Sequence, residues 1–225
     1  MILSSNQPYF LPYFPYWQLI HAADHFLVAD DFSYIRHGWI NRNRIRMLNG
    51  QEVFFRLELQ KKSCFKLISD TFLMPIVVSD KLRTVESAYH KAPFFQEGYA
   101  LMERIFACPE QNLSLFLTAS IREVCAYLGI DTPIGFTSQL KGNALLRREA
   151  RIYDFCHRMG ADHYINAIGG QQLYSFEEFR RQGIRLSFIN SHAEEAGTLS
   201  VLDAIMNHSR DALHAMLDQY TLIDG

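Results

Sequence analysis

Polar side chains able to bind a ligand or move a proton are concentrated near the start of the chain. Asn6, Gln7 and Tyr9 supply two amides and a phenol, and Asp30 and Asp31 supply two adjacent carboxylates. A carboxylate can act as a general base, a metal ligand or an acceptor for a sugar hydroxyl. Because successive side chains on a strand point to opposite faces, we expect one aspartate to face a site and the other to cap a turn.

An arginine- and asparagine-rich run follows at positions 36–44. It contains three arginines, two asparagines and a tryptophan: Arg36, Trp39, Asn41, Arg42, Asn43 and Arg44. Guanidinium groups bind phosphate or carboxylate through two parallel hydrogen bonds, and Trp39 could stack on a base or a sugar ring. The run fits a nucleotide-linked substrate, and a solvated charge run on an edge strand explains it equally well.

Later candidates are more isolated. Tyr89, His90 and Lys91 lie where we expect a helix to end, and the helix dipole alone favours cations there. His90 could act as a general base at neutral pH, although a lone histidine is more often structural. Tyr164 belongs to an expected strand whose carboxyl end is followed by Gly169-Gly170. That pair resembles a phosphate-binding loop only loosely, because the chain has neither a Walker pattern nor GxGxxG, and we expect no metal and no cofactor.

The composition is that of an ordinary globular chain of 225 residues, 48% apolar and 20% charged. The net charge of −2 gives no general attraction to nucleic acid or anionic membranes. We find neither an export signal nor the ~20 apolar residues of a spanning helix, so we expect a cytoplasmic protein. The widely spaced cysteines are predicted to be reduced thiols: Cys64, Cys108, Cys125 and Cys156.

The elements that must position the N-terminal candidates form a β-α-β unit. Ile2–Gln7 is expected to be a strand, three prolines keep residues 8–15 out of a helix, and Pro15 opens a helix. Phe26–Ala29 is the second strand, parallel to the first. Ligands bind beyond the carboxyl ends of such strands, and the helix directs its N–H groups there as well. The alternative is that the loop at 8–15 is an aromatic plug for the core.

The rest of the chain predicts one α/β domain over residues 1–225, with a mainly parallel sheet flanked by helices. Asn49-Gly50 predicts a β-hairpin, and a helical layer or insert is expected at about 80–130. The other expected elements are helices at 80–102, 112–128 and 145–159, a capped helix from Ser175, strands at 134–140, 163–167 and 184–188, and a final helix carrying Leu213, Met216, Leu217 and Tyr220.

Several of these motifs together resemble a known family. NQPYFLPYFPYWQLIHAADHFLVADDFSYIRHGWINRNRIRMLNG is similar to the N-terminal signature of the WbqC-like protein family, and the likeness continues through YHKAPFF, YINAIGGQQLY and LSVLDAIMNH. The chain departs from the pattern at Asn6, where the family usually has histidine, and at Pro15, where it tends to have glycine. The matching residues are Gln7, Pro8, Tyr9, Pro12, Asp24, Asp30, Asp31, Trp39, Asn41, Arg42, Asn43, Tyr89, Lys91, Tyr164 and Asp203.

The resemblance implies an N-acyl or aminoacyl (glycine-type) transferase acting on a nucleotide-linked amino sugar in surface-polysaccharide (O-antigen) biosynthesis. In that hypothesis Arg36 and Arg42 hold the pyrophosphate, Trp39 or Tyr9 stacks, and Asp30 or His90 takes a proton from the amine. One alternative is a nucleotidylyl-transferase-like enzyme, although this chain lacks the second histidine of the HxGH pattern that such enzymes usually have. The other alternative is a non-catalytic module that binds a sugar nucleotide. The expected partners are the nucleotide-linked sugar and an activated acyl donor, without nucleic acid or membrane; association into a homo-oligomer stays open.

Overall fold

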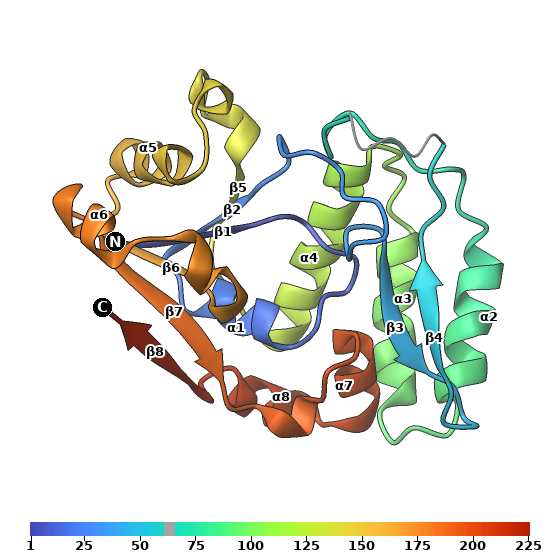
Figure 1. Cartoon of the computed structure of the whole chain (residues 1–225). Helices are drawn as coiled ribbons and strands as arrows, with labels where there is room; N and C mark the ends of the chain where they lie inside the picture. The colour runs from blue at the N-terminus through green and yellow to red at the C-terminus, as the bar shows by residue number, and fades with distance from the viewer. Residues whose placement is uncertain (61–65) are drawn as a thin grey trace.

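The computed structural model describes residues 1–60 and 66–225, and a mainly parallel sheet lies at its centre (Figure 1). Within these residues the sheet has six strands in the order β5-β2-β1-β6-β7-β8. Neighbouring strands are parallel except β7 and β8, which are antiparallel. The strands are β1 (Ile2–Asn6), β2 (His25–Val28), β5 (Ile134–Phe136), β6 (His163–Ala167), β7 (Arg185–Ser191) and β8 (Tyr220–Asp224). The predicted α/β fold class is thus confirmed.

The first β-α-β unit forms as its sequence predicts. β1 ends at Asn6, and the proline-rich loop leads to α1 (Pro15–His21), which begins at its proline. β2 then pairs in parallel with β1. Trp17 is fully buried, and its indole N–H donates to the carbonyl of Pro12 (3.1 Å). This bond fixes the end of the loop against the helix that follows it.

Helices cover both faces of the sheet. Leu27 of β2 packs in one cluster with α5 and α6, whereas its neighbours Phe26 and Val28 pack in the other with α1, α4 and α8. Burial on both faces explains why β2 carries three consecutive apolar residues, Phe26, Leu27 and Val28. The helices after α1 are α2 (Val78–Tyr89), α3 (Phe95–Phe106), α4 (Leu113–Leu128), α5 (Glu149–Met159), α6 (Phe176–Arg181), α7 (Val201–Asn207) and α8 (Arg210–Met216).

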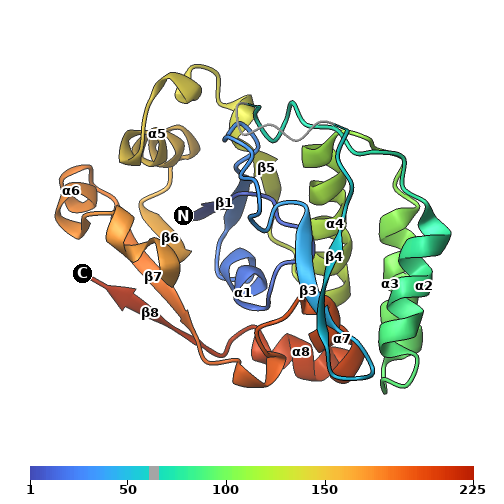
Figure 2. The same ribbon diagram turned by 45° about the vertical axis from the view of Figure 1, so that its right-hand side comes forward.

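The predicted hairpin is present as β3 (Arg42–Arg46) and β4 (Glu52–Arg56), which pair antiparallel. Its turn contains Gly50 at φ 82°, a left-handed conformation that glycine adopts without steric cost. Both views place the hairpin beside α2 and α3, on the side of the molecule away from α5 and α6 (Figures 1 and 2).

Three element predictions were wrong in detail. The helix expected at 80–102 is two helices, α2 and α3, because Pro93 has no N–H to donate and disfavours helical geometry at the residue before it. The strand expected at 134–140 ends at Phe136 and continues as a 3₁₀ turn. Tyr220 was placed on the last helix, but it begins β8, whose pairing with β7 overrides the helical spacing.

Within the described ranges, no helix is both long and apolar enough to cross a membrane. Cys108, Cys125 and Cys156 are free thiols, and burial raises the pKa of Cys125 and of Cys156 to about 12. These two thiols are therefore poor nucleophiles near neutral pH. Cys64, also predicted to be a reduced thiol, lies outside the described residues.

Candidate functional site

A cleft of about 1050 Å³ opens at the carboxyl edge of the sheet. Along the chain, β2 and then β5 are added on one side of β1, and β6 is added on the other side of β1. Strand order therefore reverses between β1 and β6, and ligands of open α/β sheets bind in the crevice at such a reversal. Ser5 and Asn6 of β1 and Asn166 and Ala167 of β6 line the cleft, so it lies at that crevice.

Six residues singled out from the sequence come together in the cleft: Asn6, Gln7, Tyr9, Trp39, Asn43 and Tyr164. Two hydrogen bonds connect the segment that carries Trp39 and Asn43 to the loop after β1. Asn43 Nδ2 donates to the carbonyl of Leu11 (2.7 Å), and the N–H of Phe10 donates to the carbonyl of Ile40 (3.0 Å). The roles of the six residues in binding stay predictions.

The loop at 8–15 has two kinds of side chain. Phe10, Leu11 and Phe14 are almost completely buried and seal one end of the core, as the plug alternative predicted. Tyr9 and Tyr13 line the cleft instead. The two interpretations of this loop therefore apply to different residues of the same segment.

Five tyrosines of the described residues line the cleft. Burial raises the pKa of each of these groups above its ordinary value: Tyr9, Tyr13, Tyr16, Tyr164 and Tyr174. The hydroxyl of Tyr164 lies 2.7 Å from Ser5 Oγ, so these two groups share a hydrogen bond. At neutral pH the tyrosines are protonated, and they can donate or accept hydrogen bonds but do not act as phenolate bases.

Three charged side chains line the cleft, and sequence reasoning did not choose any of them as a binding or catalytic residue. Arg44, from β3, pairs with Glu52 (2.8 Å). Arg148 and Glu149 lie at the start of α5, and Arg148 has φ 53°, which is strained for a residue other than glycine. Arg148 and Glu149 follow β5, a parallel strand, so the carboxyl-edge rule could have found them.

Asp30 and Asp31 lie next to the cleft but do not line it. Asp30 is 5% exposed and accepts hydrogen bonds from the backbone N–H (3.1 Å) and hydroxyl (2.8 Å) of Ser138. The hydroxyl of Thr137 lies 2.5 Å from Asp31 and 3.4 Å from Asp30. Both residues lie beyond the last residue of β2, so strand alternation does not set their directions, and the role expected for one of them in facing a site stays a prediction.

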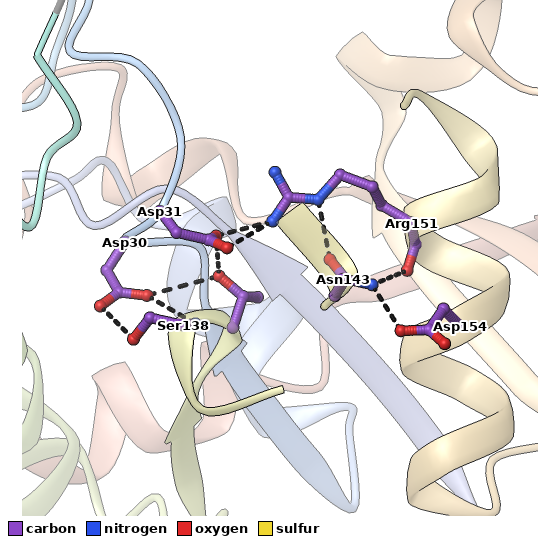
Figure 3. Close-up of polar contacts among 7 residues, drawn as sticks. Asp30, Asp31, Ser138, Asn143, Arg151 and Asp154 are labelled. Carbon is purple, nitrogen blue, oxygen red and sulfur yellow. Dashed lines mark hydrogen bonds and ion pairs between the residues drawn. The ribbon is translucent and has the colours of Figure 1, made fainter. Parts of the chain in front are cut away.

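A buried ion pair connects Asp31 to α5 (Figure 3). Arg151 Nη2 donates to both carboxylate oxygens of Asp31 at 2.7 Å, and the two side chains are 9% and 8% exposed. Arg151 Nε donates to Asn143 (2.8 Å), whose amide donates to Asp154 (2.8 Å). Since Arg148 and Glu149 precede Arg151 on the same helix, this network fixes one wall of the cleft to the end of β2.

The predicted pyrophosphate ligands do not line the cleft. Arg42 donates to the backbone carbonyls of His37 and Gly38, and its guanidinium lies 4.2 Å from the ring centre of Phe54. Arg36 is exposed on the same loop. Asn41 is buried and bonds to the Tyr34 hydroxyl (2.8 Å) and the Leu57 carbonyl (2.7 Å), so it supports the loop from within.

The residues of the expected helix end also lie outside the cleft lining. Tyr89 donates to Asp203 (3.0 Å) and accepts from the N–H of Arg46 (3.4 Å), which joins α2 to α7 and β3. His90 and Lys91 are exposed. Catalysis by His90 stays a prediction that the location of this side chain does not support.

Within residues 1–60 and 66–225, no three His, Cys, Asp or Glu side chains are grouped so that they could hold a metal ion. The chemistry available in the cleft is therefore that of two arginines, one glutamate, amides and protonated tyrosines.

Comparisons with known proteins agree with the resemblance seen in the sequence. The model of the WbqC-like protein family matches residues 7–215, which include all cleft-lining residues except Ser5 and Asn6. The "Uncharacterized protein Rv1507c" of Mycobacterium tuberculosis (strain ATCC 25618 / H37Rv) is 25% identical over 194 residues, covering 84% of this chain and 80% of that protein. No solved structure matches the chain.

The buried ion pair gives a stability prediction. Arg151→Met should lower the free energy of unfolding by ~3–5 kcal/mol, because it leaves the Asp31 charge buried without its partner. The double variant Asp31→Asn/Arg151→Met should recover most of this loss, since no unpaired charge remains. Urea denaturation of the single and double variants measures both. If the double variant is no more stable than Arg151→Met, charge pairing is not what the network contributes.

Proposed function

The chain belongs to the WbqC-like protein family, and we propose that its cleft binds a nucleotide-linked amino sugar and transfers an acyl or aminoacyl (glycine-type) group to the sugar amine. Such a reaction would serve the biosynthesis of surface polysaccharides such as O-antigen. The observation that carries this proposal is the cleft at the β1–β6 crevice, because it combines cations, aromatic faces and a carboxylate in one site.

The size and chemistry of the cleft support a ligand of this class. Its volume of about 1050 Å³ lies at the upper end for small-molecule sites, so it has room for a nucleotide, a sugar and the acyl group. Trp39 and Tyr13 are 44% and 43% exposed and offer faces on which a base or sugar ring can stack. Arg148 takes the role of binding the diphosphate, because it lines the cleft and Arg36 and Arg42 do not.

Acyl transfer to an amine needs a proton acceptor. The amine nitrogen attacks the acyl carbonyl carbon, a C–N bond forms, the bond to the leaving group breaks, and the nitrogen loses a proton. Glu149 is the carboxylate in the described lining of the cleft, and one of its oxygens accepts the N–H of Ser175 (2.9 Å). That bond orients the carboxylate and leaves its second oxygen for the proton.

A thermal-shift panel tests the proposal as a whole. UDP-glucosamine and UDP-N-acetylglucosamine should raise the melting temperature by several degrees at 100 times the dissociation constant, equivalent to about 2.7 kcal/mol. Acyl thioesters and nucleoside triphosphates complete the panel. Stabilisation by a triphosphate with release of pyrophosphate would favour a nucleotidylyl transferase. If the sugar nucleotide binds but no acyl donor is turned over, the protein is a binding module. If no compound stabilises the protein at millimolar concentration, the proposal is rejected.

Arg148→Ala should weaken the binding of UDP-N-acetylglucosamine about tenfold or more, since a hydrogen bond to a charged group contributes ~1.5–3 kcal/mol. Arg147→Ala is the matched control: it removes the same charge from the neighbouring exposed residue, which does not line the cleft. Isothermal titration calorimetry measures both affinities. Equal losses in the two variants would indicate general attraction by charge and exclude a direct contact of Arg148.

Glu149→Gln should reduce kcat for acyl transfer to UDP-glucosamine by ~10²–10⁴-fold, the usual contribution of general base catalysis. The affinity for the sugar nucleotide should stay within about twofold, because the amide keeps the shape and an oxygen that can accept from Ser175. Glu177→Gln, at an exposed glutamate of α6, is the control. An unchanged kcat in Glu149→Gln would remove this residue from the reaction.

A further inference from the structure

Three asparagines of the cleft share one local arrangement. In Asn6, Asn43 and Asn166 the side-chain oxygen accepts the backbone N–H of the next residue, at 2.8 Å in each case. This bond identifies which end of each amide is the oxygen and fixes its direction. The carbonyl end of each amide is therefore engaged within the protein, and the NH₂ end is what remains for other partners.

The three NH₂ groups differ in what they contact. Asn43 Nδ2 donates to the carbonyl of Leu11 (2.7 Å) and is used within the fold. Across residues 1–60 and 66–225, Asn6 Nδ2 donates to no protein acceptor. Asn166 Nδ2 likewise donates to no acceptor within these residues, although its amide lies close enough to Tyr174 to lower the pKa of that phenol against the effect of burial.

A glycine keeps the Asn166 amide uncovered. A Cβ added to Gly170 would come 3.3 Å from Asn166 Nδ2, closer than ordinary van der Waals contact. Gly170 lines the cleft as well. The backbone of the loop after β6 thus approaches the amide without a side chain that would separate it from a ligand.

Strand register places the two available amides on opposite sides of the sheet. Ser4 pairs with Ile165, so Asn166 is level with Ser5 and shares its face, whereas Asn6 lies on the other face. β1 and β6 are adjacent, about 4.8 Å apart. A ligand lying across the edge between these strands therefore meets an N–H donor on each side.

We propose that Asn6 and Asn166 form a donor pair that binds the diphosphate of the ligand, with one amide toward each phosphate. The inference rests on the proposed function and names the part of the substrate that lies over the β1–β6 edge. An ionised diphosphate presents only acceptor oxygens, on two phosphorus atoms joined by one bridge. Sugar hydroxyls fit less well, because each also has a proton to donate and both amide oxygens are already engaged.

Nuclear magnetic resonance of the full chain labelled with ¹³C and ¹⁵N tests the pair directly. The side-chain NH₂ signals of Asn6, Asn43 and Asn166 are assigned by through-bond correlation to their Cβ carbons, so the assignment needs no variant. Inorganic pyrophosphate, UDP-N-acetylglucosamine and uridine are then titrated separately. The signals of Asn6 and Asn166 should shift with the first two probes and not with uridine, and Asn43, whose amide is used internally, serves as the control within the same cleft.

Two variants add a functional readout. Asn6→Asp and Asn166→Asp keep an oxygen for the backbone N–H but replace the donor with a charged acceptor. Each should weaken binding of UDP-N-acetylglucosamine at least tenfold and leave binding of uridine unchanged. Asn207→Asp, on an exposed residue at the end of α7, is the control for the added charge.

The outcomes separate the two proposals. If UDP-N-acetylglucosamine binds without moving the Asn6 and Asn166 signals, the donor pair is wrong and the proposed function stands. If pyrophosphate moves both signals but no nucleotide-linked sugar binds, the donor pair stands for a diphosphate from another source and the proposed function fails. If neither probe binds at millimolar concentration, both are rejected.

Discussion

The constraint on which the rest of the molecule depends is the reversal of strand order at β1. β1 pairs in parallel with β2 on one side and with β6 on the other, so the chain must leave the sheet after β5 and return on the far side of β1. α1 and α5 consequently pack on opposite faces, and the loops that connect them to the sheet diverge at the β1–β6 edge. The cleft follows from this topology, and loop residues determine only what lines it.

Because these loops diverge, the wall of the cleft formed by the start of α5 must be held against the sheet. The Asp31–Arg151 ion pair makes this connection. Burying two charges costs several kcal/mol per ion unless geometry and further hydrogen bonds offset the lost hydration. Here two bonds of 2.7 Å, a bond to Asn143 and the ring of Phe32, 4.0 Å from the Arg151 guanidinium, supply that compensation. An apolar contact could fill the same space, but it would not fix the direction of α5. The ion pair therefore fixes the position of α5 as well as stabilising the fold.

The sequence was sufficient where a local rule decides the outcome. Short apolar runs and proline positions predicted β1, α1 and β2, and Asn49-Gly50 predicted the hairpin. It failed where tertiary contacts decide. Arg36, Arg42 and Arg44 look equivalent in the sequence, but the carbonyls of His37 and Gly38 hold Arg42, Glu52 pairs with Arg44, and of the three only Arg44 lines the cleft. No periodicity reports such a contact, and Arg148 could be placed only once β5 was known to lie parallel to β2.

The chain has a net charge of −2, yet the ligand proposed for its cleft is an anion. Long-range attraction cannot explain recognition in such a protein, so short-range donors must. Burial keeps the tyrosines protonated, which means that the aromatic surface adds no negative charge where a diphosphate would lie. Asn6, the last residue of β1, and Asn166, the residue before the last of β6, have their side-chain oxygens engaged within the chain, so their NH₂ groups are the part left for a ligand. If the proposed function holds, recognition by neutral donors, with positive charge limited to two arginines of the described lining, depends less on ionic strength than recognition by a basic patch.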